Sequence, residues 1–197
     1  MKNIVVASNN KHKISEFKLI TGTGKIRIFS PAELCMDFPE AEENGTTYEE
    51  NAIIKATSIS SLGNNDYFVL ADDSGLEVMS LGNRPGLHSA RYAGKNATNI
   101  DRINKLLAEL KGIKNRIAKF ISVIAIITPS KKIEIFRGEI TGQIIEEIKG
   151  ENGFGYDPIF VPKGYSETFA ELPSLIKDKI SHRAIAMQKA LEFILKS

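Results

Sequence analysis

The stretch Asn3-Ile4-Val5-Val6-Ala7-Ser8-Asn9-Asn10 begins with a short apolar run and ends with three polar residues. A run rich in Val and Ile is typical of a buried strand, whereas Ser and Asn side chains favour turns and helix caps. We therefore predict a strand over residues 3–7, a helix over about 11–20 and a second strand over 26–29. Because a strand, a helix and a strand follow one another within so few residues, this stretch indicates an α/β domain.

The rest of the chain continues this alternation of elements. Thr47 with Glu50 and Thr98 with Asp101 match the capping-box pattern, which marks the start of a helix. We predict further helices over about 47–62, 98–110 and 181–195 and further strands over 67–71, 116–127 and 131–141. The order of elements predicts a mixed α/β fold with an elongated central sheet flanked by helices, and two lobes around an active-site cleft, in a single domain over residues 1–197.

The composition is that of an ordinary globular protein of 197 residues, with 42% hydrophobic and 25% charged residues. The net charge of +2 argues against the concentrated basic face that a nucleic-acid partner requires. The longest apolar run, over 120–127, is too short to cross a membrane. Since no secretory signal pattern opens the chain, we expect a cytoplasmic protein with no membrane partner. Cys35 is the single cysteine, which excludes an internal disulfide and a thiolate zinc cluster.

The junction after the first predicted strand is a candidate phosphate site. A P-loop is absent, because Ile26 follows Gly22-Thr23-Gly24-Lys25 where that motif needs Ser or Thr. The segment Ser8-Asn9-Asn10-Lys11-His12-Lys13 instead combines a helix N-terminus with polar side chains and the charge of Lys13. The same pattern is also that of a simple capped helix with solvated lysines.

An acidic set follows the strand predicted over 67–71. Asp72 and Asp73 are expected to end that strand, and Ser74-Gly75 to turn the chain sharply. Carboxylates at this place, with Glu42 from an earlier loop, would suit Mg²⁺. Asp72 and Asp73 cannot both face one site if the strand stays regular, because successive residues point to opposite sides. The alternative is an exposed turn without a ligand.

Two later segments are candidates for contacts with a base. In Gly153-Phe154-Gly155-Tyr156-Asp157-Pro158 an aromatic ring lies between glycines, which favours stacking on a base. The alternative is a turn whose Phe packs into the core. Ser181-His182-Arg183, with Lys177 shortly before it, places donors near the start of the last helix, where an Arg fork can bind a carbonyl or a phosphate. Solvated side chains are the alternative here.

Taken together, these segments resemble the inosine triphosphate pyrophosphatase family. The matching segments, in chain order, are Ser8-Asn9-Asn10-x-x-Lys13-x-x-Glu16, Glu42, Glu49, Asn51, Ala52 and Lys55, Ala71-Asp72-Asp73-Ser74-Gly75-Leu76, Pro85-Gly86, Ser89-Ala90-Arg91-Tyr92, Gly153-Phe154-Gly155-Tyr156-Asp157-Pro158 and Ser181-His182-Arg183. The resemblance implies a homodimer and Mg²⁺-dependent hydrolysis of ITP, dITP and XTP between the α and β phosphates, which clears these nucleotides from the pool.

The resemblance also implies a role for individual residues. Glu42 and Asp73 would bind the metal, Asp73 would also be the general base, and Ser74 would touch the substrate. The residues implied to bind phosphates are Ser8, Asn9, Asn10, Lys11, His12, Lys13 and Lys55. The residues implied to bind the base, with Phe154 stacked on it, are Phe154, Gly155, Tyr156, Asp157, Lys177, His182 and Arg183.

The donors of Arg183 or Lys177 suit the 6-oxo group of hypoxanthine and xanthine. The 6-amino group of adenine would leave such buried donors unsatisfied, at a cost of about 1–3 kcal/mol. Two alternatives stay open, namely a nucleotide-binding sensor without turnover and a pyrophosphatase of similar fold that acts on pyrimidine triphosphates. An RNA-binding module is disfavoured by the small net charge.

Overall fold

The structure is a computed structural model that describes residues 1–22, 24–34, 41–60 and 66–197. The chain divides into two compact units. The first unit comprises residues 1–73, 122–138 and 183–197, and the second comprises 74–121 and 139–182. The expectation of a single domain over 1–197, and that of a cleft, stay predictions.

The described elements form a mixed α/β fold. The helices are α1 (Lys11–Thr21), α2 (Tyr48–Ser60), α3 (Asn99–Glu109), α4 (Ser174–Ile180) and α5 (His182–Lys196), with short 3₁₀ helices η1 (Ala32–Leu34), η2 (Met79–Leu81), η3 (Gly86–Arg91) and η4 (Asp157–Ile159). The strands are β1 (Lys2–Val6), β2 (Ile26–Phe29), β3 (Phe68–Val78), β4 (Arg84–Pro85), β5 (Ile117–Ile127), β6 (Ile133–Ile144) and β7 (Phe160–Pro162).

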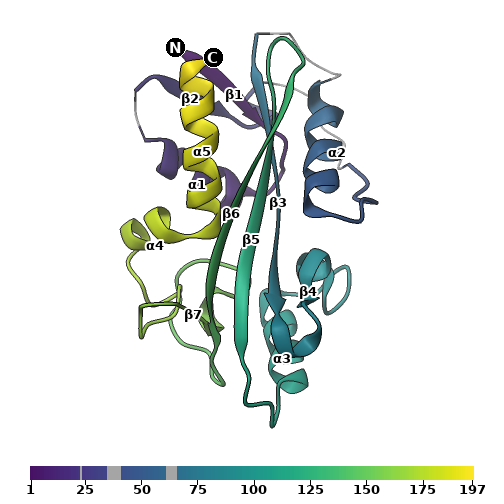
Figure 1. Ribbon diagram of the computed structural model, residues 1–197, viewed down its shortest axis with the longest axis vertical. Coiled ribbons are helices and arrows are strands. Elements are labelled where there is room, and N and C mark those ends of the chain that lie inside the picture. Colours follow the sequence, from purple (N-terminus) through teal and green to yellow (C-terminus); the bar gives the residue numbers. More distant parts are fainter. Residues whose placement is uncertain (23, 35–40, 61–65) are drawn as a thin grey trace. The chain divides into compact units, whose positions relative to one another are not determined.

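These strands form one mixed sheet in the order β2-β1-β3-β5-β6-β7, with β4 beside β3. Strand β1 runs parallel to β2 and β3, whereas β3 pairs with β4, and β6 with β7, in the antiparallel sense. Helices flank the strands (Figure 1). The predicted fold class is therefore confirmed, and so are the strand over 26–29 and the pairing of the two long strands β5 and β6.

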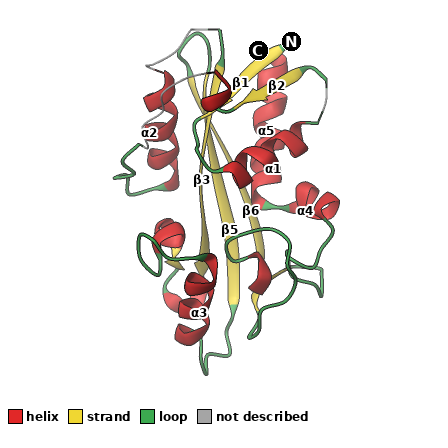
Figure 2. Ribbon diagram, turned by 180° about the vertical axis from the view of Figure 1, so that it is seen from behind, coloured by secondary structure: helices red, strands yellow, loops and turns green. Residues whose placement is uncertain are grey.

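In the first unit, helices cover both faces of the strands. Figures 1 and 2 place α1 and α5 on one side of β3 and α2 on the other. On the α1 and α5 side, Phe68 and Leu70 of β3 pack with Phe17 of α1 and Met187 of α5 in one buried cluster. Because side chains alternate along a strand, Val69 and Ala71 point to the opposite face. Residues 68, 70 and 72 thus share the face that α1 and α5 cover.

The second unit has its own core, which is rich in aromatic rings. Phe120 of β5 lies edge-on to Phe160 of β7, with ring centroids 4.6 Å apart, and Phe160 stacks on Phe169 at 5.3 Å. Leu76 and Val78, both from the second half of β3, are fully buried in the same cluster. Complete burial of a Leu or Val side chain contributes about 1.5–3 kcal/mol, so this core stabilises the unit substantially.

Predicted capping signals mark the starts of α1 and α3. Helix α1 begins at Lys11, directly after the Asn10 cap, and α5 begins at His182, close to the predicted residue 181. At α3, Thr98 and Asp101 form the complete predicted box, with the Asp101 N–H donating to the Thr98 hydroxyl and the Thr98 N–H donating to the Asp101 carboxylate. At α2 only half of the predicted box forms, because the Glu50 carboxylate accepts from Thr46 instead of Thr47.

The prediction that β3 ends at Asp72 was wrong. The strand continues through Ser74 and Gly75 to Val78. Ser and Gly favour turns when taken alone, but the burial of Leu76 and Val78 and the pairing of Glu77 and Val78 with β4 override that preference. Strand β7 and helix α4 were not predicted, since both are short. Cys35 and the predicted end of α2 at residue 62 lie outside the described residues.

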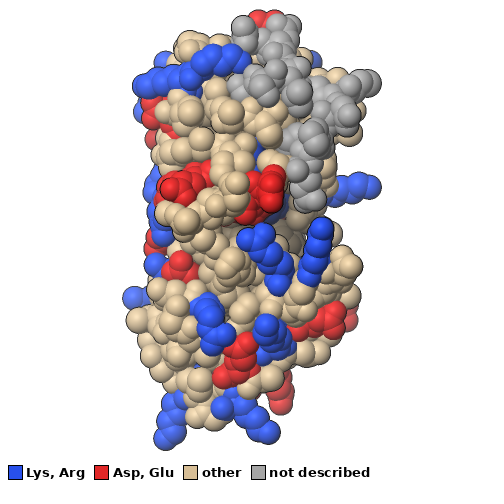
Figure 3. Space-filling view, turned by 90° about the vertical axis from the view of Figure 1, so that its right-hand side faces the viewer, with Lys and Arg blue, Asp and Glu red and all other residues tan. Residues whose placement is uncertain are grey.

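None of the described helices is long and apolar enough to span a bilayer. On the face drawn in Figure 3, Lys and Arg side chains are interspersed with Asp and Glu side chains. This face therefore offers no broad region of a single charge.

The capping box at α3 predicts a stability difference. Replacing Thr98 by Ala removes the cap, and we expect the free energy of unfolding to fall by about 1 kcal/mol. Urea denaturation followed by circular dichroism measures this change. The same replacement at Thr57, exposed within α2, is the matched control. Thr57→Ala should be neutral or slightly stabilising, because Ala has the higher helix propensity. Equal losses in both variants would contradict the role of the cap.

Candidate functional site

The first group of candidate residues lies where strand β1 ends. Val6 is in register with Leu70 of β3, and the Ala7 N–H donates to the Leu70 carbonyl at 2.6 Å. Because β1 stops here while β3 continues, Asp72 and Asp73 lie next to the junction that starts at Ser8. Ligands of open α/β sheets bind beyond the carboxyl ends of strands. The acidic pair thus lies at the carboxyl end of a strand, as predicted. That strand is β1, however, and not the strand β3 to which the pair belongs.

The junction over residues 8–13 is a capped helix start. The Asn10 side-chain oxygen accepts the N–H groups of His12 (3.0 Å) and Lys13 (3.2 Å), and the Ser8 hydroxyl accepts the N–H of Asn10 (3.1 Å). The chain itself therefore satisfies these donors. Asn9, Lys11 and His12 are exposed, whereas the Lys13 side chain is only 17% exposed and points to β3. The cation of this junction that approaches the acidic pair is Lys13.

Asp72 and Asp73 face opposite sides of β3, as strand alternation requires. Asp72 faces the side of α1 and α5, where its Oδ2 lies 2.8 Å from Lys13 Nζ. Asp73 faces α2, where its Oδ1 lies 2.7 Å from Lys55 Nζ and its Oδ2 accepts from the Asn51 amide at 3.4 Å. Lys13 and Lys55 both donate to the Asp72 carbonyl at 3.4 Å. Two lysines from different helices therefore converge on one peptide group.

The two aspartates differ in proton affinity. Burial by itself would raise the pKa of Asp72, but the charges of Lys13 and Arg183 hold that pKa well below its ordinary value. Burial raises the pKa of Asp73, and the neighbouring Lys55 opposes this shift without cancelling it. Burial would lower the pKa of Lys55, but Asp73 and Glu43 raise it above its ordinary value. At neutral pH, Asp73 is thus the carboxylate of the pair more ready to take a proton.

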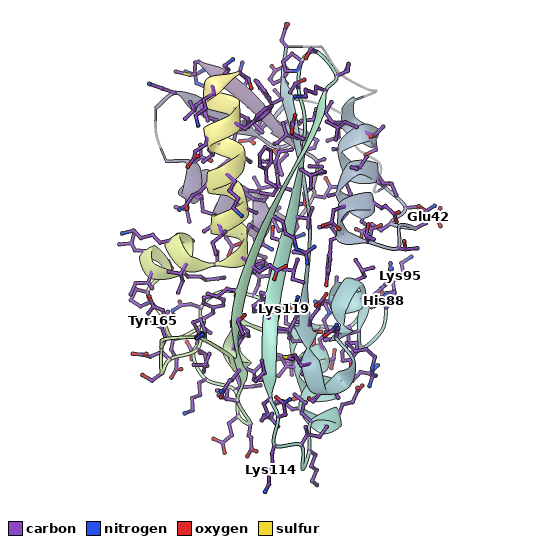
Figure 4. All side chains as sticks on the ribbon, in the orientation of Figure 1. Glu42, His88, Lys95, Lys114, Lys119 and Tyr165 are labelled. Carbon is purple, nitrogen blue, oxygen red and sulfur yellow. The ribbon has the colours of Figure 1, made fainter. Side chains whose placement is uncertain are left out.

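Of the two adjacent carboxylates in the loop before α2, Glu43 makes the ion pair within this group. Glu43 Oε1 lies 2.9 Å from Lys55 Nζ. Glu42 is exposed and projects from the loop before α2 (Figure 4). Across the described residues, no three His, Cys, Asp or Glu side chains are assembled as a metal site. A metal bound here would therefore take part of its coordination from water or substrate.

The second group of candidate residues lies in the second unit, around Asp157. Its Oδ2 lies 2.7 Å from Lys177 Nζ and also accepts the N–H of Phe154 at 2.8 Å. Lys177 Nζ lies over the Phe154 ring, 5.2 Å from its centroid. Asp157 and Lys177 are buried, whereas Phe154 and Gly155 are partly exposed. One carboxylate oxygen thus holds both a cation and a partly exposed ring in place.

Neighbouring contacts fix the rest of this group. The Tyr156 hydroxyl donates to the Ser89 carbonyl at 3.1 Å, and burial raises the pKa of Tyr156 far above its ordinary value. The His182 ring stacks on Phe120 at 4.7 Å between centroids, within 10° of parallel. Six of the residues expected to bind the base belong to this unit, namely Phe154, Gly155, Tyr156, Asp157, Lys177 and His182.

Arg183 belongs to the first unit instead. Its guanidinium is buried and pairs with Glu16 of α1 through Nη1, while its Nε lies 3.5 Å from Asp72 Oδ2. Ser74 lies partly exposed in β3, at the start of the second unit. Roles for these two residues toward a substrate stay predictions.

Sequence reasoning gave no role to three side chains of this group, namely Glu43, Asn51 and Ser122. Glu43 pairs with Lys55, Asn51 donates to Asp73, and Ser122 donates to Asp72 Oδ1 at 2.5 Å. Ser122 carried a signal, because it is a hydroxyl within the otherwise apolar run over 120–127. Such a residue is buried only when its hydroxyl has a partner. Nothing in the sequence distinguishes Glu43 from Glu42.

Two partly buried lysines thus lie against a buried carboxylate pair, and comparison with known proteins gives the family. Residues 4–193 match the Ham1 family, and the chain belongs to it. The dITP/XTP pyrophosphatases of Oceanobacillus iheyensis and Bacillus subtilis are each 45% identical to the chain over 191 residues, which cover 96% of this chain and 96% and 95% of theirs.

Solved structures agree with this assignment. The Staphylococcus aureus Ham1 protein is 42% identical, with a TM-score of 0.85 over 99% of both chains. A HAM1 protein from Coxiella burnetii is 38% identical, with a TM-score of 0.88 over 100% of both chains. The family resemblance recognised in the sequence is therefore confirmed.

The packing around Asp157 predicts an unusually costly glycine substitution. Gly153 has φ +77°, and a Cβ there would lie 2.2 Å from Asp157 Oδ2. Gly164 has φ +93° with nothing near its Cβ position, so it is the matched control. Both Ala variants carry the backbone strain of about 1–2 kcal/mol. We expect Gly153→Ala to lower the free energy of unfolding, measured in urea, by at least about 1 kcal/mol more than Gly164→Ala. Equal losses would contradict the packing described.

Proposed function

We propose that this protein hydrolyses ITP, dITP and XTP to the nucleoside monophosphate and pyrophosphate, and so removes these nucleotides from the pool. The relatives named dITP/XTP pyrophosphatases cover nearly the whole chain, which supports the substrate class. The observation that carries the chemistry is the convergence of Lys13 and Lys55 on the Asp72 carbonyl, beside the buried carboxylate of Asp73.

The phosphate end of the substrate is bound by the first group. Transfer of a phosphoryl group depends mostly on positioning and on neutralising charge. Lys13 and Lys55 supply two cations from different helices, and the segment over 8–13 adds its exposed side chains. Lys55 is shared between Asp73 and the incoming phosphates. Ser74, next along β3, contacts the substrate.

Asp73 is the general base in this proposal. Its carboxylate accepts a proton from the water that attacks the α phosphate, and the bond from the α phosphorus to the bridging oxygen breaks to release pyrophosphate. A base works best when its pKa lies close to the working pH, so the upward shift that burial produces at Asp73 suits this role. The Asn51 amide donates to Asp73 Oδ2 at 3.4 Å and orients the carboxylate.

In this proposal, Glu42 and Asp73 would hold a Mg²⁺ ion. Protein sites for Mg²⁺ commonly offer one or two carboxylates and let water and substrate phosphates complete the shell. A bound Mg²⁺ would lower the pKa of the attacking water and neutralise phosphate charge.

The base is bound by the second group in this proposal. The partly exposed Phe154 ring stacks on the purine, and Lys177, held by Asp157, donates to its 6-oxo group. Gly155, Tyr156 and His182 shape the pocket, and Arg183 completes the set that the family resemblance implies. We propose further that the enzyme is a cytoplasmic homodimer that acts on free nucleotides and not on nucleic acid or membranes, in line with its small net charge.

The proposed reaction predicts that pyrophosphate is the product released and that its release requires a metal ion. Purified protein with Mg²⁺ should release pyrophosphate from ITP faster than from ATP, GTP or dTTP. An excess of chelator should abolish release, and Asp73→Asn should lower kcat by at least about 10²-fold. Ion chromatography that separates pyrophosphate from orthophosphate measures these outcomes.

The control for that assay is Glu192→Gln, which removes an exposed charge from α5 and should leave turnover unchanged. Orthophosphate as the first product would mean that another bond is cleaved. ITP binding without pyrophosphate would favour the sensor, and faster turnover of dTTP would favour the pyrimidine enzyme. Each of these three results would overturn the proposal.

Stacking by Phe154 predicts a change in KM. Loss of an aromatic ring from a stacked base costs about 1–3 kcal/mol. We therefore expect Phe154→Ala to raise the KM for ITP by about 10-fold to 100-fold while the product stays pyrophosphate. Tyr165→Ala, which removes an exposed aromatic ring of the same unit (Figure 4), is the control and should leave KM unchanged. An unchanged KM in Phe154→Ala would contradict the stacking role.

A further inference from the structure

Asp72 has no role in the proposed reaction, yet its carboxylate is engaged on both oxygens. Its side chain is 1% exposed. Oδ1 accepts from the Ser122 hydroxyl at 2.5 Å, and Oδ2 lies 2.8 Å from Lys13 Nζ and 3.5 Å from Arg183 Nε. With a side chain that is almost fully buried and three donors around its two oxygens, the Asp72 carboxylate is arranged as a fixed anchor.

The group that this anchor holds is the ammonium of Lys13. Lys13 Nζ contacts two oxygens of Asp72, the side-chain Oδ2 at 2.8 Å and the backbone carbonyl oxygen at 3.4 Å. The same carbonyl accepts from Lys55 Nζ. A lysine ammonium ends a flexible four-carbon chain, so its place is not fixed by its backbone alone. Two acceptors on one residue give it a defined place.

We propose that Asp72 is a positioning residue of the phosphate site, which fixes the ammonium of Lys13 where it meets the substrate. This inference rests on the proposed function, because it takes Lys13 to be a phosphate contact. The two other partners of the Asp72 carboxylate hold one oxygen each. Ser122 orients the carboxylate through Oδ1, and Arg183 approaches Oδ2 from the start of α5, so that neither oxygen rotates freely.

Two opposite effects on the substrate follow from this arrangement. The negative charge of Asp72 offsets that of Lys13, and this weakens the pull of Lys13 on any anion. The same contact holds Lys13 in place, and misplacement of a catalytic contact by about 1 Å costs about 10²-fold in rate. Removal of the charge should therefore strengthen the binding of a phosphate anion and slow the reaction. A residue that merely stabilised the fold would weaken both together.

The test compares three variants by turnover of ITP and by calorimetric binding of inorganic pyrophosphate. Asp72→Asn keeps the shape of the side chain and removes its charge. Ser122→Ala keeps every charge and removes only the hydroxyl that orients Asp72, so it remains informative if Asp72→Asn folds poorly. Glu192→Gln removes an exposed carboxylate of the same unit and is the matched control. Thermal unfolding reports the folded fraction of each variant.

We expect Asp72→Asn to lower kcat by about 10²-fold and to bind pyrophosphate about fivefold more tightly, as loss of one competing ion pair would give. Ser122→Ala should lower kcat by about tenfold, because it should displace the Lys13 ammonium less than Asp72→Asn does. Its affinity for pyrophosphate should stay unchanged. The inference would be overturned if Asp72→Asn matched Glu192→Gln in both turnover and pyrophosphate binding. It would also be overturned if folded Asp72→Asn lost both turnover and pyrophosphate binding, or if Ser122→Ala kept an unchanged kcat.

The pyrophosphate experiment separates this inference from the proposed function. If the unmodified protein released no pyrophosphate from ITP, the proposed function would fail on that result alone. Binding of inorganic pyrophosphate would still report on Lys13, because it needs no turnover. Tighter binding by Asp72→Asn would then support the contact of Asp72 with an anion-binding Lys13, and unchanged binding would overturn it.

Discussion

The alternation of side chains along β3 is the constraint on which the charged centre of this protein depends. Because neighbouring residues of a strand point to opposite faces, Asp72 faces α1 and α5, and Asp73 faces α2. Each carboxylate therefore meets a different lysine from a different helix. Isolated charges in such buried places would be strongly unfavourable, since removing one member of a buried ion pair commonly costs about 3–5 kcal/mol. The charges of the candidate site thus also hold the helices to the strand.

This arrangement gives two adjacent and chemically identical side chains different properties. Asp72 is surrounded by donors, which hold its pKa low, whereas burial leaves the pKa of Asp73 raised. The environment, and not the residue type, assigns one carboxylate to hold other groups and leaves the other able to exchange a proton. A strand that ended in a loose turn at this point could not impose that difference.

Much of this could be predicted from the sequence, and the failures have physical causes. The opposite orientation of Asp72 and Asp73 follows from strand geometry, and the caps of α1 and α3 follow from local side-chain chemistry. The continuation of β3 past Ser74 was missed, because it depends on burial of Leu76 and Val78, which are distant contacts. The pairing of Lys55 with Glu43 was missed, because loop geometry selects between adjacent carboxylates. The family itself was recognised, since its motifs recur along nearly the whole chain.

Asp157 shares one oxygen between two groups, which has a consequence for how the proposed base site changes over evolution. Oδ2 of Asp157 binds both Lys177 and the N–H of Phe154. The ring and the cation are therefore not independent parts, and a replacement of Asp157 disturbs both at once. Under the proposed function, a lineage that acquires a different base preference would alter residues around this pair and leave Asp157 in place.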